Sequence, residues 1–181
     1  MERVPLPDII NTARLVLRPY SLGDVDAVFS YAADEEWGRY LPLPRPYLRK
    51  DAERFIAGQI LMDRTVHPSW AIVFKNSAIG GINIRFNFEN RLAEMGYSIA
   101  RHYWRQGFAS EAVQAVVESA FRVHPDLNRI RAMTDLRNVA SQKVLEKVGM
   151  SKEGILRQNR IVHEEFVDEV WFGLLRNEWK G

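Results

Sequence analysis

The sequence predicts a mixed α/β protein, and three patterns in the chain carry that prediction. A helix with a wholly apolar face follows residue 107, three strand-like runs precede it, and a strand, a helix and two further strand-like runs follow it. With the elements before them, these give a sheet of about six to seven strands flanked by about four helices. A chain of 181 residues can bury a core of that size, so we expect a single domain over residues 1–181.

The expected elements follow from period-two alternation in the strands and a 3.6-residue period in the helices. The strand-like runs are residues 14–18, 70–74, 79–88, 92–100, 129–134, 151–158 and 166–175. The helical runs are residues 21–33, 49–62, 109–121 and 138–148. Hairpin turns are expected at Asn76-Ser77 and Glu89-Asn90.

Local signals mark the helix boundaries. Ser21 is a plausible N-cap of the first helix, and prolines at positions 42, 44 and 46 forbid helix between the first and the second. The third helix has the clearest period in the chain, and Gly149-Met150 ends the fourth with a left-handed stop. The apolar face of the third helix is made by Ala109, Ala112, Val113, Val116, Val117, Ala120 and Phe121.

Composition excludes several function classes. Apolar residues make up 46% of the chain and charged residues 27%, with a formal net charge of +2, and the basic residues are scattered, which argues against nucleic-acid binding. The absence of cysteine excludes disulfides, thiol catalysis and cysteine-ligated zinc. The four histidines show no ligand spacing, so we expect no metal site. We see no signal peptide and no apolar run near the ~20 residues that a membrane span needs, so we expect a cytoplasmic protein.

The stretch "YWRQGFASEA", residues 103–112, places one glycine at the mouth of the third helix. A helix N-terminus has backbone N–H groups without intrahelical partners and the positive end of the dipole, so it binds phosphate readily. A plain strand-to-helix turn would look the same. The patterns of the better-known phosphate loops, G-x-x-x-x-G-K-[ST] and G-x-G-x-x-G, do not occur.

This stretch resembles the pyrophosphate loop of the GNAT superfamily of acyl-CoA-dependent N-acetyltransferases, whose pattern is Q/R-x-x-G-x-G/A. Aligned on Gly107, Trp104 stands where that pattern prefers Gln or Arg. A tryptophan is familiar there in the RimJ/RimL-like branch, whose members resemble enzymes that acetylate ribosomal-protein N-termini. Five further segments extend the resemblance over nearly the whole chain: "TARLVLRPYSLGDVDAVF", "AEMGYSIA", "NVASQKVLEKVGM", "EGILRQ" and "VDEVWFGLLRNEW".

The resemblance implies a GNAT fold with a mixed, mostly antiparallel sheet, and transfer of an acetyl group from acetyl-CoA, the cosubstrate, to a primary amine. Loop amides would hold the pyrophosphate, and the end of the preceding strand would pair with the pantetheine arm and face the thioester oxygen. The implied cofactor-binding residues are Ile99, Ala100, Arg105, Gln106, Gly107, Phe108, Ala109, Ser110, Asn138 and Ser141.

Glu94 is the candidate base. Alternation in the strand over residues 92–100 places it on a face with small residues, where it would take the amine's proton through water. The alternative is a strand glutamate paired with Arg85 or Arg91.

Ser141 is the candidate acid, in the N-x-x-S segment that the resemblance places near the cofactor's sulfur. Asn138 is equally an ordinary helix cap. Many family members use a tyrosine as the acid, but the last strand here carries Phe172 at the corresponding place.

The acceptor is less defined than the cofactor. The runs Asp34-Glu35-Glu36 and His163-Glu164-Glu165 are either a negative rim for a cationic amine or solvated surface. A protein N-terminus, a polyamine and an aminoglycoside all stay open as acceptors, as does a homodimer. The alternative to an enzyme is a non-catalytic acyl-CoA-binding module.

Overall fold

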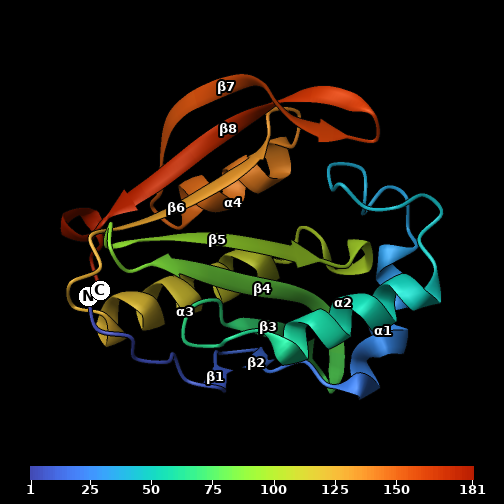
Figure 1. The fold of residues 1–181 in the computed structure, drawn as a ribbon, viewed down its shortest axis with the longest axis horizontal. Coiled ribbons are helices and arrows are strands. Elements are labelled where there is room, and N and C mark those ends of the chain that lie inside the picture. Colours follow the sequence, from blue (N-terminus) through green and yellow to red (C-terminus); the bar gives the residue numbers. More distant parts are fainter.

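The computed structural model describes all 181 residues and contains one eight-stranded sheet in the order β1-β2-β3-β4-β5-β6-β8-β7 (Figure 1). The strands are β1 (Ile10–Asn11), β2 (Val16–Arg18), β3 (Ser69–Phe74), β4 (Ser77–Asn87), β5 (Leu92–Ile99), β6 (Arg129–Asp135), β7 (Ser151–Val162) and β8 (Glu165–Leu175). The helices are α1 (Val25–Ala32), α2 (Arg49–Leu61), α3 (Phe108–Val123) and α4 (Val139–Lys147). The predicted mixed α/β fold is confirmed.

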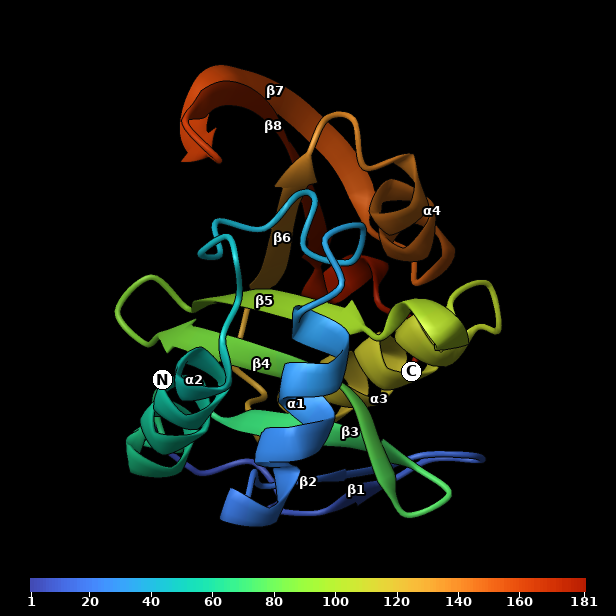
Figure 2. The ribbon, with the colours of Figure 1, turned by 90° about the vertical axis from the view of Figure 1, so that its right-hand side faces the viewer.

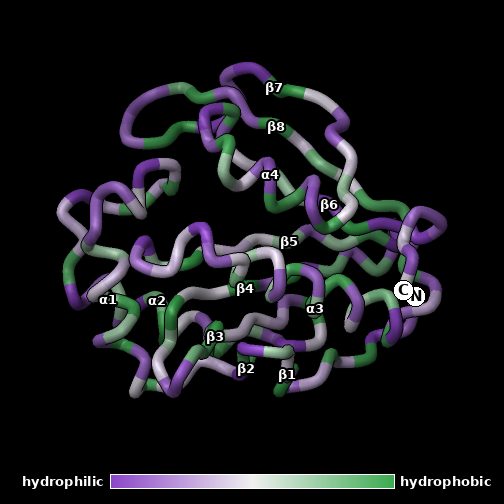
Figure 3. The backbone as a smooth tube through the Cα atoms, turned by 180° about the vertical axis from the view of Figure 1, so that it is seen from behind, coloured by the Kyte–Doolittle hydropathy of each residue, from purple (hydrophilic) through white to green (hydrophobic).

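Helices cover both faces of the sheet (Figure 2). Alternation along β3 explains why, because Trp70 and Ile72 belong to a core shared with α3 and α4, whereas Ala71 and Val73 belong to a core shared with α1 and α2. Seen from behind, α3 and α4 lie in front of the sheet (Figure 3). The apolar face predicted for the third helix is confirmed, since six of its seven residues belong to the larger core and the seventh, Ala109, packs against it.

β5 and β6 are the one parallel pair of the sheet, and they pair only over residues 92–95 and 129–132. Beyond these residues the two strands diverge, as Figure 1 shows toward its right side. We call residues 96–99 of β5 and 133–135 of β6 the fork. Along the fork β4 continues to pair with β5 and β8 continues to pair with β6, so the edges left open there are the two that face each other.

The structure differs from the sequence-based elements at a few boundaries. The two-residue strand β1 was not expected, because so short a run carries no period. The turn between β3 and β4 is Lys75-Asn76 and not Asn76-Ser77, since both turn residues have positive φ (48° and 65°) and Ser77 already pairs with Phe74. Strand β7 extends to Val162, four residues beyond its predicted end.

Other boundaries are as expected. Ser21 begins the first helical segment, which opens as a 3-10 turn, and its amide donates to the Asp24 carboxylate at 2.8 Å. Gly149 has φ of +90° and the amide of Met150 donates to Leu145 O at 3.0 Å, which confirms the left-handed stop. None of the helices combines the length and the apolar character needed to cross a membrane.

Candidate active site

The segment from Arg105 to Ser110, predicted to be the pyrophosphate loop, presents a run of free main-chain amides. The amide of Trp104 donates to Arg101 O at 3.1 Å, and that of Glu111 donates to Gly107 O at 3.1 Å. None of the six amides between them donates to a protein acceptor. They span the turn that leads into a 16-residue helix and the first turn of that helix, whose dipole adds positive potential at the same place, so this segment has the donors that a pyrophosphate requires.

Gly107 is the conformational pivot of the loop. Its φ of +82° lies in the left-handed region and it forms the N-cap of α3, so a residue with a side chain would be strained there. A Cβ at this position would also lie 3.3 Å from a guanidinium nitrogen of Arg14. The sequence signal of a single glycine before a helix was therefore sufficient to find the turn.

Side chains from the N-terminal segment hold the loop against α3. The Arg14 guanidinium donates to Gln106 O at 2.9 Å, lies 4.4 Å from the centroid of Phe108 and forms an ion pair with Glu111 at 2.7 Å. The Thr12 hydroxyl donates to the same carboxylate at 2.6 Å. Partial burial opposes ionisation of Glu111, but the hydrogen bonds from Thr12 and Arg14 outweigh it and lower the pKa of the carboxyl below its ordinary value.

The end of β5 leads directly into this loop. The amide of Ala100 donates to Ile79 O at 2.7 Å, which makes Gly80 and Ile99 a non-hydrogen-bonded pair and turns the main-chain groups of Ile99 away from β4, toward the fork. Both Ile99 and Ala100 were expected to pair with the cofactor. The Ala100 amide is already committed and its carbonyl accepts from Tyr103, so Ile99 is the residue with a main chain directed at the fork.

Trp104 ties the loop to that strand end. Its indole Nε1 donates to Ile99 O at 2.6 Å, although the side chain is otherwise exposed. Trp104, which departs from the usual loop pattern, therefore has a structural role. Its hydrogen bond fixes the loop relative to Ile99 and satisfies the Ile99 carbonyl. The Ile99 amide stays directed at the fork.

Helix α4 brings Ser141 to the fork from the side of α3. The Asn138 carboxamide accepts from the Ser141 amide at 3.1 Å, so Asn138 is the N-cap of α4, the ordinary alternative noted for it. The Ser141 hydroxyl lies 2.8 Å from the phenol oxygen of Tyr97 on β5. Tyr97 is not among the site residues expected from the sequence. Phe172 is fully buried in the core.

Glu94 lies where β5 and β6 still pair, on the face of α1 and α2. It stands opposite Arg131, which donates to its Oε2 from Nε at 3.0 Å and pairs with the same oxygen from a terminal nitrogen at 2.9 Å. Arg85 lies 3.4 Å from Oε1. The ion-pair alternative is thus present with Arg85, and the second partner is Arg131 and not Arg91.

Two buried carboxylates that were not foreseen lie on the same face, past the paired region. Asp135 and Glu169 are 6% and 3% exposed and stand opposite one another on β6 and β8. Arg137 binds Asp135, and its hydrogen bonds outweigh the effect of burial and lower the pKa of that carboxyl below its ordinary value. Asn159 donates to Glu169 at 2.7 Å. Only the β6–β8 pairing joins these residues, so no spacing in the sequence could reveal them.

The acidic runs predicted as a rim are brought near each other. His163 Nε2 lies 3.2 Å from Gly38 O, which links the β7–β8 turn to the loop between α1 and α2. Asp34 forms an ion pair with Arg101 at 2.6 Å and Glu165 lies 3.4 Å from Arg137. The carboxylates of the runs are therefore partly neutralised by arginines.

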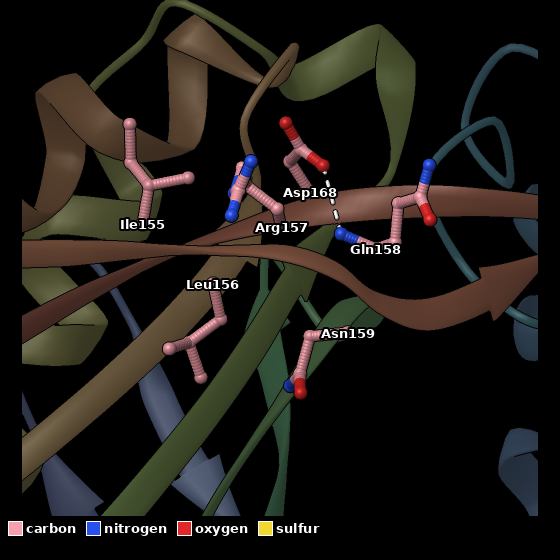
Figure 4. Close-up of a pocket in the computed structure, with 6 residues that line it drawn as sticks. All are labelled: Ile155, Leu156, Arg157, Gln158, Asn159 and Asp168. Carbon is pink, nitrogen blue, oxygen red and sulfur yellow. Dashed lines mark hydrogen bonds between the residues drawn. The ribbon is translucent and has the colours of Figure 1, made fainter.

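An open pocket of about 640 Å³ lies on the β7–β8 hairpin, and its residues are drawn in Figure 4. It forms where β7 bulges between Leu156 and Arg160, and the Gln158 amide there donates to Asp168 at 2.8 Å. None of the expected cofactor-binding or catalytic residues lines it. No group of three or more His, Asp or Glu side chains is arranged to hold a metal ion.

Comparison with known proteins places this geometry in a family. Residues 14–151 match the model of the acetyltransferase (GNAT) domain. The chain is 32% identical over 179 residues to the uncharacterized N-acetyltransferase p20 of Bacillus licheniformis, covering 96% of this chain and 99% of that protein. It is 25% identical over 122 residues to the ribosomal-protein-serine acetyltransferase of Escherichia coli, covering 66% of this chain and 67% of that one.

A solved structure agrees with the sequence relatives. The crystal structure of a GNAT-family acetyltransferase from Bacillus anthracis superimposes with a TM-score of 0.83 at 26% identity, covering 94% of this chain and 99% of that one. The predicted GNAT fold is thereby confirmed, with one strand more than expected. The free amides of the pyrophosphate loop, the family match and the shared fold lead to one conclusion: this chain belongs to the GNAT acetyltransferase family and is an acetyl-CoA-dependent N-acetyltransferase.

Proposed function

We propose that this enzyme acetylates the α-amine of a protein N-terminus, by direct attack of the amine on acetyl-CoA in a ternary complex. The observation that carries the proposal is the fork, which interrupts the sheet between Ser141 on one face and the carboxylates Asp135 and Glu169 on the other. With the thioester of acetyl-CoA at the fork, the rest of the cofactor lies on the side of α3 and α4. The amine approaches the thioester from the side of α1 and α2.

The cofactor side fits the pyrophosphate of acetyl-CoA. The six free amides from Arg105 to Ser110 supply donors, and Ile99 offers one more toward the fork. Bound acetyl-CoA supplies the activated acetyl group. Main-chain donors held in place before the reaction stabilise a developing oxyanion by roughly 2.7–4 kcal/mol, and we assign this role to the Ile99 amide.

The proton steps are assigned to Glu94 and Ser141. An α-amine has a pKa of about 8, so part of it is neutral at physiological pH and modest help suffices. Glu94 takes the amine's proton through water running along Gly96 and Ser98, the small residues between it and the end of β5. Ser141 passes its hydroxyl proton to the departing sulfur and regains one from solvent.

Charge pairing on the acceptor side favours a monoamine over a polycation. Asp34, Asp135 and Glu165 each have an arginine within ion-pair distance, and Glu169 lies 3.7 Å from Arg160. A polyamine or aminoglycoside requires several free carboxylates, whereas one peptide α-amine requires little net negative charge. The likeness to a ribosomal-protein-serine acetyltransferase supports the same acceptor class.

A panel of acceptors tests the proposal. CoA release is measured with peptides carrying different N-terminal residues, the same peptides with blocked N-termini, spermidine, and an aminoglycoside. We expect turnover with free N-termini and none with blocked ones. Turnover with spermidine or the aminoglycoside alone would show that the acceptor is a small amine and not a peptide N-terminus.

A binding experiment separates the enzyme from a non-catalytic acyl-CoA-binding module. Acetyl-CoA at 100 times its Kd stabilises a protein by about 2.7 kcal/mol, so a rise in Tm reports binding whether or not transfer occurs. A rise in Tm with acetyl-CoA, without turnover on any acceptor, would indicate a non-catalytic acyl-CoA-binding module.

A further inference from the structure

Tyr97 and Ser141 are joined across the fork by a hydroxyl pair. Tyr97 lies on β5 two residues beyond Met95, the last residue that pairs with β6. Its phenol oxygen is 2.8 Å from Ser141 Oγ and 3.1 Å from Ser141 O in the first turn of α4. These contacts connect the open part of β5 to α4, at the place where the thioester sulfur is expected.

The two hydroxyls have two possible hydrogen-bond arrangements. If the phenol donates to Ser141 O, the Ser141 hydroxyl is left to donate to the phenol oxygen. If the phenol donates to Ser141 Oγ, the Ser141 hydrogen has no protein acceptor and is free to point into the fork. Rotation of the two O–H bonds interconverts them with no movement of heavy atoms.

We propose that Tyr97 is a positioning residue for acetyl transfer, whose phenol donates to Ser141 Oγ and thereby directs the Ser141 hydrogen at the departing sulfur. The inference rests on the role of Ser141 in the proposed function. The amine nitrogen forms the new C–N bond, the C–S bond breaks with its electron pair on sulfur, and the Ser141 proton passes to that sulfur. The phenol stabilises the charge that develops on Oγ until a solvent proton, balanced by the one that the amine releases, restores the hydroxyl.

Two further observations agree with this assignment. Burial raises the pKa of Tyr97 to about 12, against the opposing effect of its hydrogen bond with Ser141, so the phenol keeps its proton and remains a donor at physiological pH. Phe172 on β8 is fully buried and has no proton to give. The phenol at the sulfur side of this site therefore comes from β5 and not from β8.

Steady-state kinetics on Tyr97→Phe, Ser141→Ala and the double variant test the proposal, with the best acceptor of the panel. We expect Tyr97→Phe to lower kcat about tenfold, with KM for acetyl-CoA within twofold of wild type. The double variant should be no slower than Ser141→Ala, because the phenol acts through that hydroxyl. Tyr20→Phe is the matched control, since Tyr20 is a buried tyrosine whose hydroxyl makes no hydrogen bond, and it should keep the wild-type kcat.

A second measurement needs no acceptor and does not respond to a packing role. CoA is bound to each protein, and the ultraviolet absorbance of its thiolate is followed with pH. The Ser141 hydrogen bond stabilises the bound thiolate, so Tyr97→Phe and Ser141→Ala should both raise the pH at which the bound thiol ionises, while Tyr20→Phe should not.

The outcomes separate this inference from the function on which it rests. If Ser141→Ala kept the full kcat, Ser141 would not be the acid, and the positioning role of Tyr97 would fall with it. A slow Ser141→Ala beside a fully active Tyr97→Phe, losses that multiply in the double variant, or an unchanged thiol titration in Tyr97→Phe would overturn the role of Tyr97 alone.

Discussion

The two sides of the fork are built from different kinds of groups. The side that we assign to the cofactor presents main-chain amides, held in place by Trp104, which bonds to the end of β5, and by Arg14, which bonds to the loop itself. The side that we assign to the acceptor presents charged side chains in pairs, such as Asp135 with Arg137. Main-chain donors recognise an anion whatever the neighbouring side chains, whereas paired side chains can be exchanged to suit another amine. This difference explains why the sequence alone predicts the cofactor but does not predict the acceptor.

The largest expected effect falls on the cofactor side. Gly107→Val places a β-branched residue at φ of +82° and a Cβ 3.3 Å from Arg14. Strain of roughly 1–3 kcal/mol in the loop should raise the Kd for acetyl-CoA about 10- to 100-fold, measured by calorimetry. Gly154→Val is the matched control, because nothing lies within 4 Å of a Cβ there. An unchanged Kd in Gly107→Val would mean that the loop does not hold the pyrophosphate.

Glu94→Gln tests whether the carboxylate between Arg85 and Arg131 also serves as the base. At low pH most of the amine is protonated, so the help of a base matters most there, and we expect turnover to fall about tenfold below neutral pH and less at high pH. The measurement is the pH–rate profile. Glu118→Gln, which removes a surface ion pair on α3, is the control. A profile of unchanged shape would leave Glu94 with a purely structural role.

A pair of arginine variants compares the two sides directly. Arg14→Met removes the hydrogen bond to Gln106 O and should raise KM for acetyl-CoA about fivefold, with KM for the peptide unchanged. Arg137→Met frees Asp135 and should change KM for the peptide by a similar factor, with KM for acetyl-CoA unchanged. If both variants altered the same constant, the division of the site into two sides would be wrong.

The smallest effect is on acid stability, and it concerns one carboxylate from each side. The pKa values of Glu111 and Asp135 are lowered in the folded state, so each stabilises the fold above its unfolded pKa, near 4.5 and 3.8, and loses that contribution as pH falls through the lower folded value. We expect Glu111→Gln and Asp135→Asn to have a Tm a few degrees below wild type near neutral pH, with the difference shrinking as the pH falls below the unfolded pKa of each carboxyl. A difference that stayed constant with pH would show that packing, not ionisation, is lost.

Much of the fold could be predicted from local patterns, because the spacing of apolar residues and the turn and cap residues at the ends determine the long helices and strands. The apolar face of α3 and the stop at Gly149 are examples. The position of the β3–β4 turn was wrong by one residue, because Lys75 adopts positive φ and glycine is absent. The two-residue strand β1 is held by pairing with β2 and has no pattern of its own.

The candidate site divides in the same manner. Gly107 and the loop after it are contiguous in sequence, so their form was visible. Tyr97 beside Ser141, and Asp135 beside Glu169, are contacts between elements far apart in the chain, which only the folded sheet creates. The partner Arg85 of Glu94 was foreseen, but the second partner was missed, because Arg131 lies 37 positions away on a strand that pairs in parallel.

The fork also bears on how this sheet avoids self-association. Exposed strand edges recruit strands from other chains, and proteins ordinarily blunt or cover them at the rim of the sheet. Here an unpaired edge lies in the interior of the sheet, between β5 and β6, with the start of α4 bonded to it through Tyr97. Because strands of the same sheet flank it on both sides, this edge is shielded from a strand of a second copy. An interruption that would promote self-association at the rim of the sheet is thereby protected in its interior.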